Sequence, residues 1–225
     1  MNYKLSPSDL TFLYDGCRRC FWLKVRQGIV QPSIPLPGIF SKIAGLLKTH
    51  YSGMRTEKVH SALPPGIVKY GEKWVQSQPI SFEDHEHTVY IKGRFDIVVE
   101  FDDKTYGVVD FKTGNPDEEK ADLYSRQLHA YIYALEHPVP GAIGLSPITK
   151  LGLLYFYPND TSQPSLEKLN YESDVHWVEI QRNDDTFKRF LETALAVLES
   201  DTPPALTPGC NWCGYAAKLA REKLI

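Results

Sequence analysis

The sequence has 225 residues, of which 42% are hydrophobic and 24% are charged. This length suits a single domain spanning residues 1–225, and no stretch has the apolar length of a signal peptide or membrane-spanning helix. We therefore expect a cytoplasmic protein without a membrane partner. The net charge of −3 excludes a chain that binds nucleic acid through a strong overall positive charge, but it leaves room for a local basic surface.

Helical signals dominate the first fifty residues. The run Ser6-Pro7-Ser8-Asp9 predicts a helix start, with a serine cap, proline at the first helical position and an acid in the first turn. Apolar residues continue to about Gln27, and Gly16 is a candidate kink. After several prolines, a second amphipathic helix is predicted from about Gly38 to Tyr51.

A β-hairpin is predicted next, after two strands at Ile80–Phe82 and His87–Lys92. Two apolar runs, Ile97–Val99 and Tyr106–Val109, flank the polar pair 102–103, which is typical of strands joined by an acidic turn. Asp96 opens the first strand and Asp110 closes the second. The hairpin can therefore bring the two carboxylates close together.

Lys112 follows Asp110 by two residues, so both side chains project to the same side of the strand. The peptide of Phe111 lies between them. Two carboxylates, a main-chain carbonyl and an ammonium group around one point suit Mg²⁺ or Mn²⁺, which prefer oxygen ligands and can activate water beside a phosphate. The alternative is that Asp110 and Lys112 are ordinary charges at the end of a strand.

The second half of the chain alternates helices and strands. A helix is predicted up to about residue 136, and it carries Gln127 and Tyr131 one turn apart on one face. The apolar run Lys150–Tyr157 predicts a buried strand that ends at Pro158, followed by a strand at 177–180 and a helix at 184–200. This order predicts an α/β fold with a mixed central sheet flanked by helices.

Two C-x-x-C pairs lie at opposite ends of the chain, Cys17 with Cys20 and Cys210 with Cys213. Four thiolates can bind a tetrahedral zinc ion or an iron–sulfur cluster, and the spacing alone does not choose between them. Either metal would join the two end regions, residues 1–30 and 203–225, and would contribute to folding.

Three motifs in order resemble the PD-(D/E)XK nuclease superfamily: Gly93-x-x-Asp96, Asp110-x-Lys112 and Gln127-x-x-x-Tyr131. The resemblance is strongest to the RecB-like branch, which includes CRISPR-associated and AddB-type iron–sulfur exonucleases. It implies a restriction-endonuclease-like fold with its catalytic core at residues 80–180.

The resemblance also implies roles for individual residues. Asp96, Asp110 and the main-chain carbonyl of Phe111 would hold the metal, and Lys112 would assist the attacking water. Gln127 and Tyr131 would position DNA or the lysine. The helix at 38–51 often carries a metal-binding histidine in this branch. The corresponding place, counted from Gly38, is Lys42, so this sequence departs from the pattern there, and His50 is the candidate ligand on this helix.

For the four cysteines, the resemblance implies a [4Fe–4S] cluster, with Zn²⁺ as the alternative. It implies a Mg²⁺- or Mn²⁺-dependent deoxyribonuclease, acting as an exonuclease on single-stranded DNA ends. The competing hypothesis is a non-catalytic nucleic-acid-binding or scaffold module that keeps the nuclease fold and a structural four-cysteine metal site.

Overall fold

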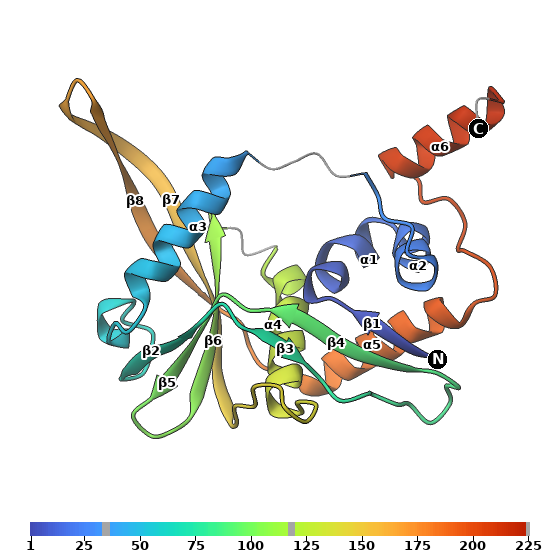
Figure 1. Cartoon of the computed structure of the whole chain (residues 1–225), viewed down its shortest axis with the longest axis horizontal. Helices are drawn as coiled ribbons and strands as arrows, with labels where there is room; N and C mark the ends of the chain where they lie inside the picture. Colours follow the sequence, from blue (N-terminus) through green and yellow to red (C-terminus); the bar gives the residue numbers. More distant parts are fainter. Residues whose placement is uncertain (33–36, 117–119, 224–225) are drawn as a thin grey trace.

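The computed structural model describes residues 1–32, 37–116 and 120–223 (Figure 1). A π-helical turn at Asp9–Leu13 precedes the helices, which are α1 (Tyr14–Gly16), α2 (Arg18–Gln27), α3 (Gly38–Tyr51), α4 (Ala121–Glu136), α5 (Asp184–Glu199) and α6 (Asn211–Arg221). The strands are β1 (Asn2–Leu5), β2 (Gly66–Gly71), β3 (Trp74–Gln76), β4 (Thr88–Arg94), β5 (Ile97–Phe101), β6 (Tyr106–Thr113), β7 (Ile148–Ser165) and β8 (Lys168–Glu179). In this described part of the chain, every helix is too short or too polar to cross a membrane.

A mixed sheet in the order β2-β5-β6-β7-β8 forms the centre of the molecule. Strands β6 and β7 run parallel, and the other neighbouring pairs are antiparallel. The predicted hairpin is present as β5 and β6, with Ile97 opposite Val109 and Val98 opposite Val108. The predicted fold class, a mixed central sheet flanked by helices, is confirmed.

Both faces of the sheet are buried, because successive side chains of a strand point to opposite sides. Val98, Val108 and Leu153 face the core that includes residues of α4 and α5. Ile97, Val99 and Val109 face a second core, which is closed by the end of α3 and the segment after it. Helices therefore flank the sheet on both sides, as an α/β architecture requires.

A second, smaller sheet in the order β1-β4-β3 adjoins the first. The chain passes from β4 into β5 through Phe95 and Asp96, so the end of the small sheet leads directly into the central one. Gly93 lies just before this junction, where an added Cβ would lie 2.6 Å from Pro7 Cδ and 3.3 Å from Tyr131 Cε1. The glycine of the Gly93-x-x-Asp96 motif therefore lets the N-terminal segment and α4 approach β4.

Strands β7 and β8 continue as a hairpin well beyond the rest of the sheet (Figure 1). The prediction that the strand ends at Pro158 was wrong, since β7 runs to Ser165. Pairing of β6 with β7 ends at Thr113 and Phe156, so beyond this point β7 is paired with β8 alone. A proline is tolerated there because an edge strand does not need every N–H group, and the register shifts between Pro158 and Asp160.

Candidate active site

The hairpin of β5 and β6 brings the two predicted aspartates to one place. Asp96, at the bend before β5, accepts a hydrogen bond on Oδ2 from the main-chain N–H of Phe111, at 2.9 Å. Asp110 is 4% exposed on the neighbouring strand. Lys112 projects to the same side, and its Nζ lies 2.5 Å from Asp110 Oδ2. The structure therefore places Asp96, Asp110, Lys112 and the Phe111 peptide together.

Helix α4 supplies two polar side chains behind this group. Gln127 donates from Nε2 to Asp110 Oδ1 at 3.1 Å and accepts from Lys112 Nζ at 3.2 Å, so it bridges the acid and the base. The Gln127 amide also donates to the hydroxyl of Tyr131 at 3.3 Å, and that hydroxyl donates to the carbonyl of Arg94 at 2.9 Å. This network fixes the orientation of the amide, so the Asp110–Lys112 pair is held from behind.

Burial changes the protonation behaviour of the site. Removal from water raises the pKa of Asp110 to about 6, against the lowering effect of Lys112, and Asp96 raises it further. Burial, followed by the charge of Asp110, also raises the pKa of Tyr131. A carboxylate that is costly to ionise inside the protein is one that a bound cation would stabilise.

The donor atoms fit a hard divalent ion. Asp110 Oδ2 is buried and, apart from its ion pair with Lys112, has no hydrogen-bond partner among the described residues. With Asp96 and the predicted main-chain ligand of Phe111, it offers an all-oxygen set, which Mg²⁺ and Mn²⁺ prefer. The chemistry of the side chains is therefore compatible with the metal that the sequence motifs imply.

The residue of α3 that reaches these acids is Lys48. Its Nζ lies 2.7 Å from Asp96 Oδ1 and 2.5 Å from Glu72 Oε1, and Glu72 also lies 3.4 Å from Arg94 NH1. His50, the predicted helix ligand, is exposed and its ring lies edge-on against Tyr51. Because residues two apart on a helix point in nearly opposite directions, the structure does not bring His50 to Asp96 and Asp110.

Lys48 and Glu72 were missed by the sequence analysis. A signal for Lys48 was present, since it lies three residues before the buried Tyr51, on the apolar side of an amphipathic helix. A lysine at such a position needs an anionic partner. Nothing comparable marked Glu72, because it follows a strand that the sequence pattern did not reveal.

Comparisons with known proteins identify the family of this chain. The family model described as "PD-(D/E)XK nuclease superfamily" matches residues 45–217. The chain belongs to the PD-(D/E)XK nuclease superfamily. The solved structure described as "Crystal structure of SSO0001" is similar in fold, with a TM-score of 0.51 and 14% sequence identity, over 95% of this chain and 84% of that one. A search of curated proteins gives no match.

Members of the PD-(D/E)XK superfamily are mostly metal-dependent nucleases, so a nuclease-type function and a nucleic-acid substrate are supported for this chain. The matched region includes all three motifs that carry the proposed catalytic residues. It also extends into α6, so it includes Cys210 and Cys213.

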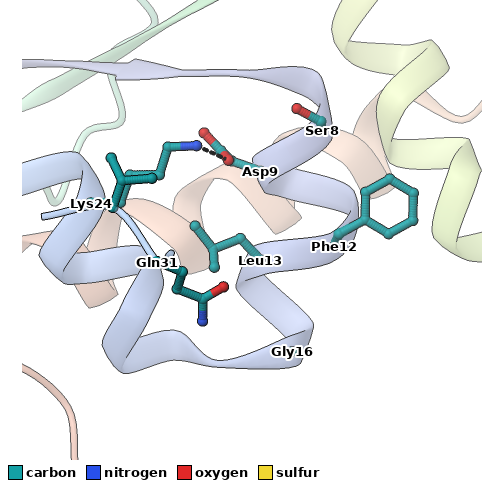
Figure 2. Close-up of a pocket in the computed structure, with 8 residues that line it drawn as sticks. Ser8, Asp9, Phe12, Leu13, Gly16, Lys24 and Gln31 are labelled. Atoms are coloured by element: carbon teal, nitrogen blue, oxygen red, sulfur yellow. Dashed lines mark hydrogen bonds and ion pairs between the residues drawn. The ribbon is translucent and has the colours of Figure 1, made fainter. Parts of the chain in front are cut away.

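Two aromatic rings extend the candidate site beyond Lys112. The Lys112 ammonium lies 4.0 Å from the centre of the Tyr124 ring, and the ring of Phe12 meets Tyr124 edge-on at 5.7 Å. Phe12 is 51% exposed. Phe12 lines a cavity of about 350 Å³. Figure 2 shows Phe12 on one side of it and the Asp9–Lys24 ion pair on the other.

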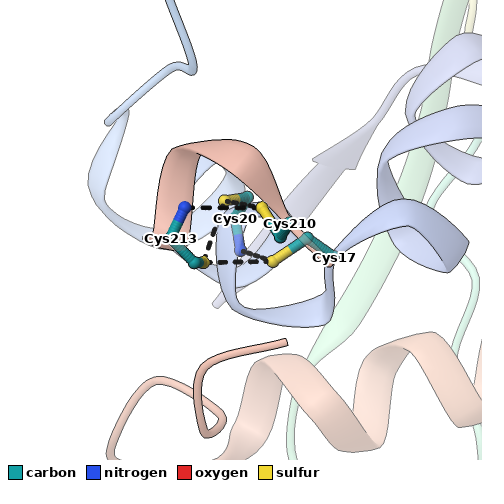
Figure 3. Close-up of side chains that lie close together, drawn as sticks. All are labelled: Cys17, Cys20, Cys210 and Cys213. Carbon is teal, nitrogen blue, oxygen red and sulfur yellow. Dashed lines mark hydrogen bonds between the residues drawn. The ribbon is translucent and has the colours of Figure 1, made fainter. Parts of the chain in front are cut away.

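The four cysteines form a second site, remote in sequence from the motifs (Figure 3). All four are free thiols, and their sulfur atoms lie within 4.8 Å of one another. Cys17 Sγ is 3.4 Å from Cys213 Sγ, and Cys20 Sγ is 3.7 Å and 3.9 Å from those of Cys213 and Cys210. The predicted gathering of both C-x-x-C pairs is confirmed, and it can bind a metal.

The helix starts create this arrangement. Cys17 and Cys210 each precede a helix, α2 and α6, and each accepts a hydrogen bond from the N–H group three residues later. Although burial raises the pKa of Cys17, hydrogen bonds from Thr207 and the Cys20 amide lower it to about 6. Cys17 is therefore the thiol that most readily supplies the thiolate a metal needs.

Proposed function

We propose that this protein is a Mg²⁺- or Mn²⁺-dependent deoxyribonuclease that hydrolyses phosphodiester bonds. The observation that carries the proposal is the convergence of Asp96, Asp110 and Lys112 around one point. Asp96, Asp110 and the carbonyl of Phe111 would hold the ion. When bound, such an ion supplies an activated water and stabilises negative charge on the phosphate.

The protein's own residues prepare the reaction. Lys112 holds an ammonium group next to the metal-binding acids, where it would orient the attacking water or offset charge on the phosphate. Gln127 holds that ammonium and the Asp110 carboxylate in place through hydrogen bonds to both, and Tyr131 holds the Gln127 amide. We assign Gln127 and Tyr131 as positioning residues for this pair.

We further propose that single-stranded DNA ends are the preferred substrate and that the protein acts as an exonuclease. The exposed ring of Phe12 supports this choice, since it lies one ring beyond Tyr124, which contacts Lys112. Unpaired bases stack on aromatic side chains, whereas paired bases cannot leave the duplex without cost. A strand lying with its phosphate at Lys112 would bring a neighbouring base towards Phe12.

The test is cleavage of end-labelled single strands, matched duplexes and circular single strands in Mn²⁺ or Mg²⁺. Wild type should shorten the linear single strand and leave the circle intact, and Asp110→Ala and Lys112→Ala should be inactive. Lys188→Ala, which changes an exposed lysine of α5, is the matched control and should keep full activity. Equal cleavage by wild type and Asp110→Ala would contradict the proposed site.

The second candidate, a non-catalytic nucleic-acid-binding module, is favoured by one observation. Lys48 already pairs with Asp96, so the site has an internal cation at one of its proposed metal ligands. Such a module would bind DNA without cleaving it in any divalent metal. Binding of labelled single strands by a protein that leaves them intact in Mn²⁺ would favour this candidate over the enzyme.

At the four cysteines we propose a structural metal, with zinc now preferred to the [4Fe–4S] cluster that the resemblance implied. Four sulfurs about 2.3 Å from a single tetrahedral zinc ion stand about 3.8 Å apart. The separations of 3.4, 3.7 and 3.9 Å support that geometry. In a cluster each thiolate binds a different iron and the sulfurs stand farther apart. A brown protein with visible absorption would overturn this preference.

A further inference from the structure

The Lys48 ammonium occupies a position that the enzyme hypothesis does not explain. Its Nζ contacts Asp96 Oδ1 at 2.7 Å, while Asp96 Oδ2 accepts the Phe111 N–H. Both oxygens of a proposed metal ligand are therefore engaged, one of them by a positive charge. The Lys48 side chain is 17% exposed, so water screens this pair only in part.

A divalent ion at Asp96 would meet this ammonium at short range. A lysine side chain is ordinarily protonated at neutral pH, and the Lys48 ammonium has two acidic partners at short range, Asp96 and Glu72. The ion and the ammonium repel each other at this distance, and Asp96 Oδ2 is already engaged by the Phe111 N–H, so the two cations compete for Asp96 Oδ1.

Glu72 offers the ammonium a second position. Its Oε1 lies 2.5 Å from Lys48 Nζ, and its other oxygen lies 3.4 Å from Arg94. The hydrogen bond from Lys48 lowers the pKa of Glu72, so the Glu72 carboxylate stays ionised. The four-carbon stem of a lysine is flexible, so the ammonium can leave Asp96 and stay with Glu72 while the backbone of α3 stays in place.

We propose that Lys48 is a built-in counter-ion that competes with the catalytic metal for Asp96, and that Glu72 receives the ammonium when the metal binds. This inference rests on the proposed metal site at Asp96 and Asp110. It makes Lys48 a positioning residue that lowers metal affinity. Glu72 has the opposite effect, because it draws the ammonium away from Asp96.

The proposal predicts that Mn²⁺ affinity changes in opposite directions when Lys48 and Glu72, which contact each other, are replaced. Lys48→Met removes the competing charge and should tighten Mn²⁺ binding by at least tenfold. Glu72→Gln leaves the ammonium with Asp96 as its only acidic partner among the described residues, and should weaken Mn²⁺ binding severalfold. Lys188→Met, which changes an exposed lysine of α5, should bind Mn²⁺ as wild type does.

The experiment is titration of the purified full-length proteins with Mn²⁺ at neutral pH, without DNA, with free Mn²⁺ followed by electron paramagnetic resonance. Asp110→Asn identifies which binding event belongs to the proposed site. Thermal melting gives a second readout: Lys48→Met should melt below wild type in metal-depleted buffer, because three acids then face fewer cations, and should gain more from added Mn²⁺. Lys48→Gln, which removes the charge and keeps a hydrogen-bond donor, gives the same test if Lys48→Met does not fold.

The outcomes separate this proposal from the proposed function. Tighter binding by Lys48→Met together with weaker binding by Glu72→Gln supports both. If wild type binds Mn²⁺ in a way that Asp110→Asn abolishes, but Lys48→Met binds it no more tightly, the competition is refuted and the metal site stands. If neither wild type nor Lys48→Met binds Mn²⁺ at a site sensitive to Asp110→Asn, the metal site fails, and the competition fails with it.

Discussion

Replacing Asp110 by asparagine should make the metal-depleted protein more stable at alkaline pH. Burial raises the pKa of this carboxyl from 3.8 to about 6, so ionising it costs more in the folded chain than in the unfolded one. At about 1.4 kcal/mol for each pH unit, the difference corresponds to about 3 kcal/mol. Asparagine carries no charge to desolvate and keeps an oxygen for the Gln127 amide.

The gain should depend on pH in a defined direction. Below about pH 4 the carboxyl is protonated in both states, so its ionisation costs the wild type no stability. As the pH rises the unfolded chain loses this proton first, and wild-type stability falls until about pH 6, where the folded carboxyl also ionises. Asp110→Asn should therefore be about 3 kcal/mol more stable at about pH 8 and gain about half as much at about pH 5.

Urea denaturation at the two pH values measures this difference. The buffers should be depleted of divalent ions on a chelating resin, because a strong soluble chelator could remove a metal from the four cysteines. Asp201→Asn, an exposed aspartate after α5, is the control and should change stability little at either pH. An Asp110→Asn protein that is less stable than wild type at pH 8, or whose advantage is the same at both pH values, would refute the reasoning.

Three further predictions concern other parts of the molecule. Cys210→Ser should lose the bound metal and lower the melting temperature. The loss in free energy of unfolding should be at most about 5 kcal/mol, the value for a cross-link that spans 190 residues, and metal content unchanged from wild type would rule out the shared site. Phe12→Ala should weaken binding of single-stranded DNA by about 1–3 kcal/mol and leave duplex binding unchanged, as measured by fluorescence anisotropy. An equal loss of affinity for single-stranded and duplex DNA would show that bases do not stack on the ring. Gly93→Ala should cost about 1–3 kcal/mol in urea denaturation because its Cβ would overlap Pro7, and wild-type stability would show that Pro7 can move aside.

The central hairpin was predictable because each of its signals is local. Alternating β-branched residues on both sides of an acidic turn define the strands, and the two-residue period places Asp110 and Lys112 on one side. The structure adds that the backbone N–H of Phe111 anchors Asp96. The helix with Gln127 and Tyr131 was also predictable from its 3.6-residue apolar period.

The features that sequence reasoning missed depend on long-range pairing. Strand β1 has only four residues and pairs in parallel with β4 from the other side of a long connection, so no local pattern marks it. The stretch Ile80–Phe82, expected as a strand, makes only an isolated bridge, between Ile80 and Val89. The contact between Lys48 and Asp96 joins a helix to a strand bend, and only the folded packing brings them together.

The projecting β7–β8 hairpin accounts for the acidity of the whole chain. Its outer part, residues 158–175, carries one basic and four acidic residues: Lys168, Asp160, Glu167, Glu172 and Asp174. The whole chain has 25 basic and 28 acidic residues, so the rest has 24 of each and no net charge. Because β7 continues past Phe156, which pairs with Thr113 just after Lys112, the arm leaves the sheet at the same end as the candidate site. It therefore repels a polyanionic strand on one side of that site and favours an approach from the side away from the arm.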